Sequence, residues 1–269
     1  VTYLDTESWR GEALLSYLRK MIFWAQVGVE PADLAVLTLL GAGITEPAVV
    51  QCLGLTALPD DVAVALPGGG FVRRAPGADL PELDLLVPRS ETGAWMRRLT
   101  AAGVRPAGTW AHEAHRVAAL RPRLGVDTDE RTIPHEVGWI GGPGQGAVHL
   151  DKGCYRGQET VARVHNLGKP PRMLVLLHLD GAAERPAAGD PVLAGGRVVG
   201  RLGTVVDHVD LGPIALALLK RGLPADTPLH TGGDHQVGAA IDADSLPPSD
   251  AAGAGRVAVD RFRGAGRDV

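Results

Sequence analysis

The sequence predicts an α+β protein, with a body of ferredoxin-like character followed by a small β-barrel. Over residues 1–168, short apolar strands alternate with amphipathic helices and are joined by short Gly/Pro turns, which is typical of an α+β sandwich. Beyond residue 172, short strands and glycine turns follow one another at regular spacing, as in a small barrel. Pro170 and Pro171 stiffen the chain between the two patterns.

This pattern divides the chain into an α+β body over 1–168, a barrel over 169–242 and a flexible tail over 243–269. A further division of the body into about 1–103 and 104–168 stays open. Repeated Ala, Gly and Arg leave the tail too little apolar surface to order itself. The chain begins at Val1 without a methionine, so we expect either a missing upstream part or a non-standard start.

The body is expected to begin with a strand and then an amphipathic helix over about 14–23. Further helices are expected at 46–53, 91–102 and 109–120, and strands at 1–4, 27–29, 34–40, 62–66, 71–74 and 83–87. At their spacing, Trp9, Tyr17 and Trp24 are predicted to be core residues rather than a binding face. The barrel strands are expected at 173–179, 191–193, 197–202, 204–209, 214–219 and 229–230.

Composition and charge exclude several classes of function. Lys and Arg number 27 against 31 Asp and Glu, and the net charge of -4 argues against binding to nucleic acid or an anionic membrane. No apolar run in the sequence is long enough to span a membrane, and we expect no signal peptide. Two dissimilar cysteines make no disulfide framework, so a reducing compartment, the cytoplasm, is expected. Cys52 lies among aliphatic residues and is interpreted as packing.

Cys154 has different surroundings. It lies between two cations, Lys152 and Arg156, in a glycine-containing loop. Apolar residues at helical spacing over 161–167 predict a helix directly after the loop. Positive charge and a helix N-terminus both favour the thiolate over the thiol. A free cysteine is most often a small buried residue, but these polar neighbours do not make an apolar pocket. We therefore interpret Cys154 as reactive.

The same stretch, Lys152-Gly-Cys-Tyr-Arg-Gly-Gln-Glu159, resembles the Lys-Gly-Cys-Tyr-x-Gly-Gln-Glu signature of the YgfZ family in all seven fixed positions. Arg163 fits the Val-Ala-Arg that commonly follows it. Members of that family are folate-binding relatives of the glycine-cleavage T-protein, an aminomethyltransferase, and are tied to iron–sulfur cluster assembly or repair. The resemblance implies a T-protein-like body with a C-terminal barrel, and partners among iron–sulfur proteins or their assembly factors.

In this interpretation Cys154 is the working residue, either a transient cluster ligand or a thiolate in exchange with a partner. Lys152 and Arg156 would stabilise its charge. The site would be shaped, and the loop anchored to its helix, by Tyr155, Gln158, Glu159 and Arg163. One thiolate cannot hold a cluster alone, so no stably bound metal is expected.

A second stretch resembles the T-protein pattern Arg-x-Glu-Ala-Gly-x-Pro-x-x-Gly, which precedes an acidic residue and Pro-x-Glu. The matching residues are Arg116, Pro122, Gly125, Asp127, Pro134 and Glu136. The resemblance implies that Arg116, Asp127 and Glu136 contribute to binding tetrahydrofolate or a derivative. Ala118 stands where the family has the glutamate that holds the pterin ring, and Leu120 where it has glycine. From the residues alone, Asp127 could equally belong to a polar turn.

Two other patterns in the sequence are weaker evidence of function. His112 and His115 are three residues apart, whereas the zinc-protease pattern needs four, and no third ligand lies nearby. The glycines of 141–146 lack dinucleotide-binding spacing and are interpreted as a mobile loop that could cover the cysteine. Two other functions stay open: a tetrahydrofolate-dependent aminomethyl or methyl transferase, and a non-catalytic folate-sensing module. T-proteins lack the cysteine signature, and YgfZ members usually carry a further N-terminal stretch not found here.

Overall fold

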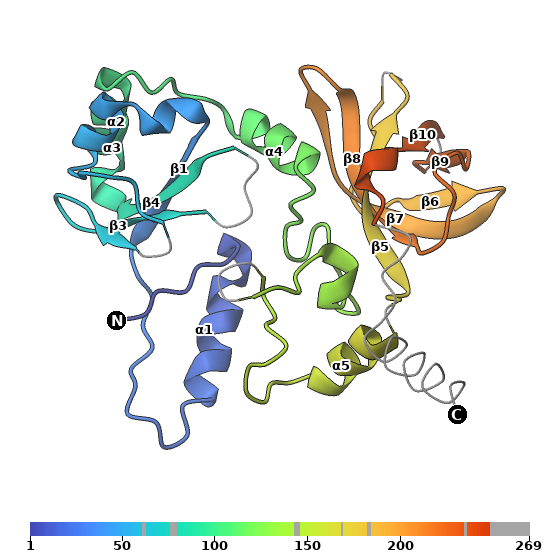
Figure 1. Cartoon of the computed structure of the whole chain (residues 1–269), viewed down its shortest axis with the longest axis horizontal. Helices are drawn as coiled ribbons and strands as arrows, with labels where there is room; N and C mark the ends of the chain where they lie inside the picture. Colours follow the sequence, from blue (N-terminus) through green and yellow to red (C-terminus); the bar gives the residue numbers. More distant parts are fainter. Residues whose placement is uncertain are drawn as a thin grey trace, which may run out of the picture. The chain divides into compact units, whose positions relative to one another are not determined.

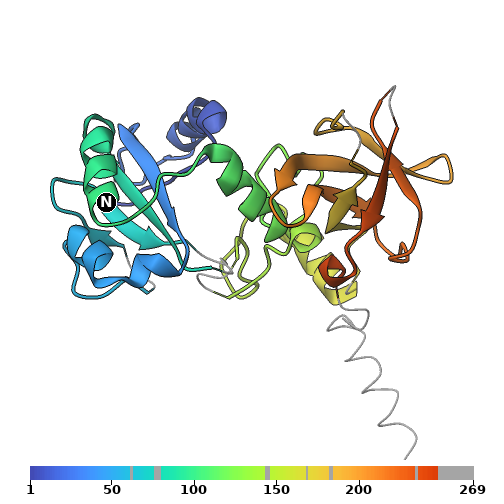
Figure 2. The same cartoon turned by 90° about the horizontal axis from the view of Figure 1, so that it is seen from above.

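The computed structural model describes residues 1–60, 63–75, 80–142, 146–167, 169–181, 184–233 and 236–247. The chain forms two compact units, Val1–Pro106 and Ala107–Val269 (Figures 1 and 2). The division therefore lies at residue 106, so the segment between 107 and 168 belongs to the same compact unit as the barrel.

The first unit is built on a four-stranded antiparallel sheet in the order β1-β4-β3-β2. The strands are β1 (Leu34–Leu40), β2 (Val64–Ala65), β3 (Phe71–Arg74) and β4 (Glu82–Pro88). Leu37 pairs with Leu85, so the alternate apolar residues of β1 and β4 share one face. Of the predicted strand over 62–66, residue 62 lies outside the described residues and two residues form β2.

One face of this sheet is covered by α2 (Pro47–Cys52) and α3 (Thr92–Ala101) (Figure 1). Val72, Leu83 and Leu85 of the sheet pack with Trp95 of α3, which is 1% exposed. Cys52 packs against the same cluster, consistent with its interpretation as a packing residue. The short helices η2 (Ala42–Thr45) and η3 (Arg89–Glu91) connect the strands to α2 and α3.

The N-terminal segment differs from its prediction. The helix is present as α1 (Gly11–Lys20), preceded by η1 (Ser8–Arg10), but residues 1–4 and 27–29 form no strand. The prediction that Trp9, Tyr17 and Trp24 are core residues is wrong, because they are 61%, 49% and 98% exposed. Helix α1 buries none of its residues, and the core cluster on the sheet is formed with α2 and α3 instead. Apolar residues at helical spacing do not show whether another helix or a sheet packs against that face of the helix.

The second unit contains a closed antiparallel barrel in the order β10-β5-β8-β7-β6-β9. Its strands are β5 (Arg172–Leu179), β6 (Pro191–Ala194), β7 (Arg197–His208), β8 (Gly212–Lys220), β9 (Leu229–Thr231) and β10 (Val237–Ile241). The predicted α+β fold with a C-terminal barrel is confirmed. The two strands predicted at 197–202 and 204–209 are one strand, β7, with a bulge between Leu202 and Val205. Gly203, the residue between the two predicted strands, lies in this bulge.

Strands β5 and β8 are buried on both sides. Val175 and Leu177 of β5 point into the barrel, whereas Leu176 joins a second cluster outside it. Helix α4 (Thr109–Ala118) covers that outer face with Ala114 and Val117. The apolar run in β8 therefore has two covered faces, as in a central strand.

Contacts with the barrel continue past the predicted boundary at residue 242. The turn η5 (Ala243–Ser245) returns to β5, where the Leu176 amide donates to Ser245 Oγ at 3.1 Å. His178 and Asp242 also lie 2.9 Å apart across this connection. Residues 248–269, most of the predicted tail, lie outside the described residues.

Candidate functional site

The cysteine loop is held at both ends. Upstream, buried Val148 forms a parallel bridge with Ile140, and its amide donates to the Trp139 carbonyl at 3.0 Å. Downstream, helix α5 (Gln158–Leu167) buries Val161. The predicted helix after Cys154 is thus present, and the loop extends between two anchored segments. Residues 143–145 of the predicted mobile loop lie outside the described residues.

The sequence Gly-Gln at the start of α5 explains how the loop turns into the helix. Gly157 has a φ of +89°, a conformation that favours glycine, and its carbonyl accepts from the Thr160 and Val161 amides. Gln158 Oε1 accepts a hydrogen bond from the Tyr155 amide at 3.1 Å. Gln158 therefore ties the helix to the residue directly after Cys154.

Cys154 itself is a free, exposed thiol. Lys152 Nζ lies 4.5 Å from the centre of the Tyr155 ring and donates to the Ala147 carbonyl at 3.4 Å. This cation–π contact holds Lys152 beside the residue that follows the thiol. Arg156, Glu159 and Arg163 are also exposed, and none of their side chains makes a hydrogen bond or ion pair with the described residues. The loop thus keeps exposed polar groups available for a ligand or partner.

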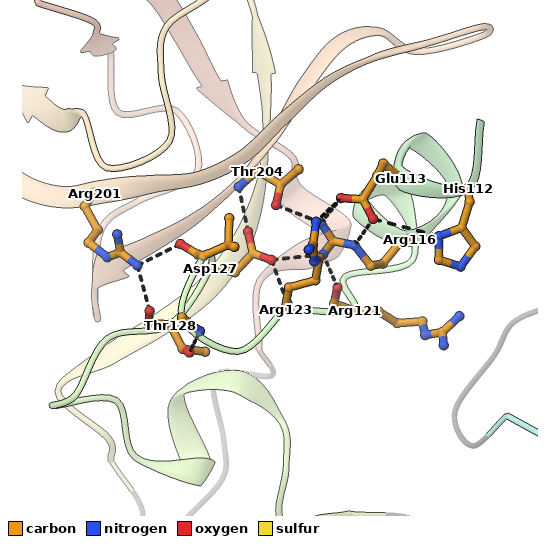
Figure 3. Close-up of polar contacts among 11 residues, drawn as sticks. His112, Glu113, Arg116, Arg121, Arg123, Asp127, Thr128, Arg201 and Thr204 are labelled. Atoms are coloured by element: carbon orange, nitrogen blue, oxygen red, sulfur yellow. Dashed lines mark hydrogen bonds and ion pairs between the residues drawn. The ribbon is translucent and has the colours of Figure 1, made fainter. Parts of the chain in front are cut away.

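The predicted folate residues have the opposite environment. Arg116 of α4 is buried, and its guanidinium donates through Nε, Nη1 and Nη2 to five acceptors (Figure 3). The acceptors are both carboxylate oxygens of Glu113, the Arg121 carbonyl, Asp127 Oδ2 and Thr204 Oγ1. An arginine has five N–H donors, so this set accounts for all of them.

Asp127 joins α4 to the barrel. Its Oδ1 accepts from the Thr204 amide at 2.6 Å, and its Oδ2 accepts from the Arg123 amide and from Arg116 (Figure 3). Thr204 lies in the bulge of β7, next to Gly203. A Cβ on Gly203 would lie 2.3 Å from Asp127 Oδ1, so glycine is required for this close approach.

Two further residues complete this network. Arg201 of β7 donates from Nη2 to the carbonyls of Val126 and Thr128, on either side of Asp127 (Figure 3). Burial by itself would raise the pKa of Glu113, but hydrogen bonds from His112 and Arg116 lower that pKa well below its usual value. Glu113 therefore stays ionised beside Arg116.

Glu136 belongs to a neighbouring ion-pair cluster around Arg172, at the start of β5. Glu136 lies in η4 (Pro134–Val137), and both of its carboxylate oxygens accept from Arg172, at 2.9 and 2.8 Å. Arg172 also donates to Asp129 at 2.7 Å. The hydrogen bonds to Glu136, and then those to Asp129, raise the pKa of Arg172. The hydrogen bond from Arg172 in turn lowers the pKa of Asp129. This cluster attaches η4 to the barrel.

The departures from the T-protein pattern also have structural counterparts. Leu120, where the family has glycine, has a φ of +53°. The backbone keeps the left-handed turn that glycine adopts at lowest cost. Ala118 is half-buried and packs against the cluster under α4. Sequence reasoning missed Glu113, Arg172 and Thr204, because their partners lie in other elements and no local motif marks them.

Sequence and structure comparisons relate the chain to one group of proteins. No family model matches the sequence. It is 32% identical to an aminomethyltransferase of Nostoc sp. over 174 residues, which are 61% of this chain and 44% of that protein. It is 35% identical to an aminomethyltransferase of Rippkaea orientalis over 139 residues, which are 49% of this chain and 35% of that protein. The chain spans less than half the length of the curated relatives that it matches.

The fold is also similar to that of an aminomethyltransferase. The crystal structure of the glycine cleavage system aminomethyltransferase T from Bartonella henselae superposes with a TM-score of 0.66, at 18% identity. The match covers 87% of this chain and 65% of that one. The chain has an aminomethyltransferase fold. Among the residues described, no helix is long and apolar enough to cross a membrane, and no three His, Cys, Asp or Glu side chains gather in a metal-binding group.

Proposed function

We propose that the protein is a folate-binding accessory factor of iron–sulfur cluster assembly or repair, acting through Cys154 in the cytoplasm. The observation that carries the proposal is the exposed, unpaired thiol in the loop before α5, with Lys152 held against the ring of the next residue, Tyr155. An exposed thiol near positive charge can act as a nucleophile or a ligand. Residues of the family signature, Tyr155 and Gln158, hold this loop together.

The chemistry proposed for Cys154 is shared with a partner. Iron–sulfur clusters are normally held by several cysteine thiolates. Cys154 would therefore supply one ligand, or attack one bond, while the iron–sulfur protein or assembly factor supplies the others. The exposed Arg156, Glu159 and Arg163 would then contact the partner rather than the cluster.

The folate part of the proposal is supported by the likeness to aminomethyltransferases. The Arg116 side chain has no N–H to spare, so a folate carboxylate could reach it only by replacing an existing acceptor. Arg116, Asp127 and Glu136 would thus support the folate-binding surface through the α4–barrel and η4–barrel connections. With Ala118 in place of the pterin-binding glutamate, we expect weaker folate binding than in a T-protein.

A tetrahydrofolate-dependent aminomethyl or methyl transferase is the second candidate, favoured by the sequence similarity to aminomethyltransferases. It predicts turnover of an aminomethyl or methyl donor that needs tetrahydrofolate. A Cys154→Ser change would leave that turnover largely intact, because T-proteins lack the cysteine signature. A folate-sensing module would bind folate equally well with Cys154 or serine and would turn over no donor.

The deciding experiment uses cells that lack the protein, with the activity of an iron–sulfur enzyme as the readout. The wild-type gene, Cys154→Ser and the matched control Cys52→Ser are reintroduced at equal protein levels. The proposal expects wild type and Cys52→Ser to restore the activity and Cys154→Ser to fail. Equal restoration by Cys154→Ser would show that the thiol is not the working group. If wild type also fails to restore activity, the cluster-maintenance proposal is overturned, and the transferase assay with tetrahydrofolate follows.

A further inference from the structure

His135 is a histidine of η4 whose ring has no hydrogen-bond partner among the described residues. Both ring nitrogens, Nδ1 and Nε2, are buried, and neither forms a hydrogen bond with the residues that the structure describes. The adjacent carboxylate, Glu136, is used by Arg172 and by the Ile133 amide. Buried polar atoms without partners are rare and call for a ligand, an ion or a water.

A second histidine faces it from the helix that follows the cysteine loop. The rings of His135 and His165 of α5 have centroids 6.0 Å apart and an interplanar angle of 36°. Burial, and then the neighbouring His165, lower the pKa of His135. His135 is therefore neutral near pH 7, and a neutral imidazole has the lone pair that a metal ligand needs.

The ring separation can be compared with that of two histidines on one ion. With metal–nitrogen distances of about 2.0–2.1 Å, two imidazole rings that share an ion have centroids about 5–6.5 Å apart, depending on the angle at the metal. The observed 6.0 Å lies within this range. At the tetrahedral angle that zinc prefers, the centroids would lie about 5.2 Å apart, so sharing an ion requires ring rotations and a further approach of the rings of about 1 Å or less.

We propose that His135 and His165 form a two-histidine site for a borderline divalent cation of the zinc type. Imidazole ligands suit zinc, copper and nickel, and water or a ligand from solution would fill the remaining positions. The ion would join η4, which the Arg172 cluster attaches to the barrel, to α5, whose first residue supports the Cys154 loop. A metal at this position would thus stabilise the base of the cysteine loop without contacting the thiol.

Zinc titration of the metal-stripped full chain by calorimetry tests this proposal. Wild type is expected to bind one zinc ion, and His135→Gln and His165→Gln are each expected to weaken binding roughly ten-fold or more. His112→Gln is the matched control, because His112 lies in the same unit beside Glu113, and it should bind as wild type does. Far-UV circular dichroism establishes that each variant is folded. Absence of zinc binding by wild type at millimolar zinc, or unchanged binding by folded His165→Gln, would overturn the site.

A cobalt titration distinguishes the two histidines from the nearby thiol. With Co²⁺, the proposal expects visible absorption without the near-ultraviolet thiolate band, and the same spectrum in Cys154→Ser. A thiolate band that disappears in Cys154→Ser would instead show that Cys154 holds the ion, and the two-histidine site would be wrong. Because protons compete for imidazole, binding should also weaken as the pH falls below about 6.5.

Discussion

The Arg116 network and the Cys154 loop belong to the same unit, and each concentrates charged side chains that the sequence marks as functional. In the network, Arg116 and Asp127 are 5% and 2% exposed, and every N–H of the guanidinium has an acceptor. In the loop, Lys152 and Cys154 are exposed. Each region is anchored to the rest of the unit by buried residues.

The difference shows how to tell a structural motif from a reactive one. A buried ion pair whose hydrogen bonds are all satisfied is costly to break and leaves nothing for a ligand to occupy. An exposed charge costs little to redirect towards a partner, because solvent already competes for it. Matching a family pattern identifies both kinds of residue, but only their surroundings show which kind each one is.

The largest expected effect is on stability, from Asp127→Ala. This change removes a carboxylate with a fully buried side chain and leaves Arg116 and the Thr204 amide without it. Removing one partner of a buried pair costs about 3–5 kcal/mol. The free energy of unfolding would be measured from amide hydrogen exchange of β5 and β8 in increasing urea. The control Asp207→Ala removes a carboxylate that is 67% exposed and should cost about 1 kcal/mol or less. Equal losses in both variants would contradict the comparison.

Gly203→Ala should act on the same network from the barrel side. The new Cβ would meet Asp127 Oδ1 at 2.3 Å and Asp127 Cα at 3.1 Å, so the loop or the bulge must shift. Overpacking of this kind costs about 1–3 kcal/mol. Gly233→Ala is the control, because its Cβ would meet no atom of the described part of the chain within 4 Å. Thermal unfolding midpoints of the two variants give the comparison, and an unchanged midpoint for Gly203→Ala would show that the close approach is not required.

Acid should destabilise the unit in two steps. The pKa of His135 is lowered from 6.5, so the unfolded chain binds more protons than the native one, and stability falls as the pH decreases below about 6.5. The pKa values of Glu113 and Asp129 are lowered from 4.5 and 3.8, so their contributions are lost as the pH falls further, below about 4. Urea midpoints between pH 8 and pH 3 measure both steps.

Single variants assign the two steps. His135→Gln should remove the decline that begins near pH 6.5 and leave the acid decline in place. Asp129→Asn should flatten the decline below about pH 4. A profile of Asp129→Asn that parallels wild type throughout would mean that the Arg172 cluster contributes no measurable stability.

The smallest expected effect concerns the loop. A negatively charged disulfide reagent should modify Cys154 in the folded chain before Cys52, which packs against the core of the first unit. Lys152→Gln should slow this reaction roughly two- to five-fold at low salt, as expected for an exposed charge. The difference should disappear with an uncharged reagent. A rate that Lys152→Gln leaves unchanged with both reagents would show that Lys152 does not act on the thiol.

Much of the architecture could be predicted from local patterns. A continuous apolar run located β1, a short apolar stretch located β4, and regularly spaced short strands with glycine turns located the barrel, because these patterns depend on neighbouring residues alone. The N-terminal prediction was wrong because helical spacing in α1 shows an apolar face but not whether another element covers it. The bulge at Gly203 was also missed, since the Asp127 carboxylate that packs against it is 76 positions away in the chain.

The sequence by itself determined that Cys154 precedes a helix beside two cations, because loop, charge and helix are adjacent in the chain. It also determined that Arg116 and Asp127 belong to one pattern. Only the tertiary structure decided that these two are saturated by Glu113 and by the barrel, and that His135 meets His165, 30 positions away. The physical reason is that burial and hydrogen bonding depend on which residues, far away in the sequence, contact the site in the folded chain. No local sequence pattern specifies those residues.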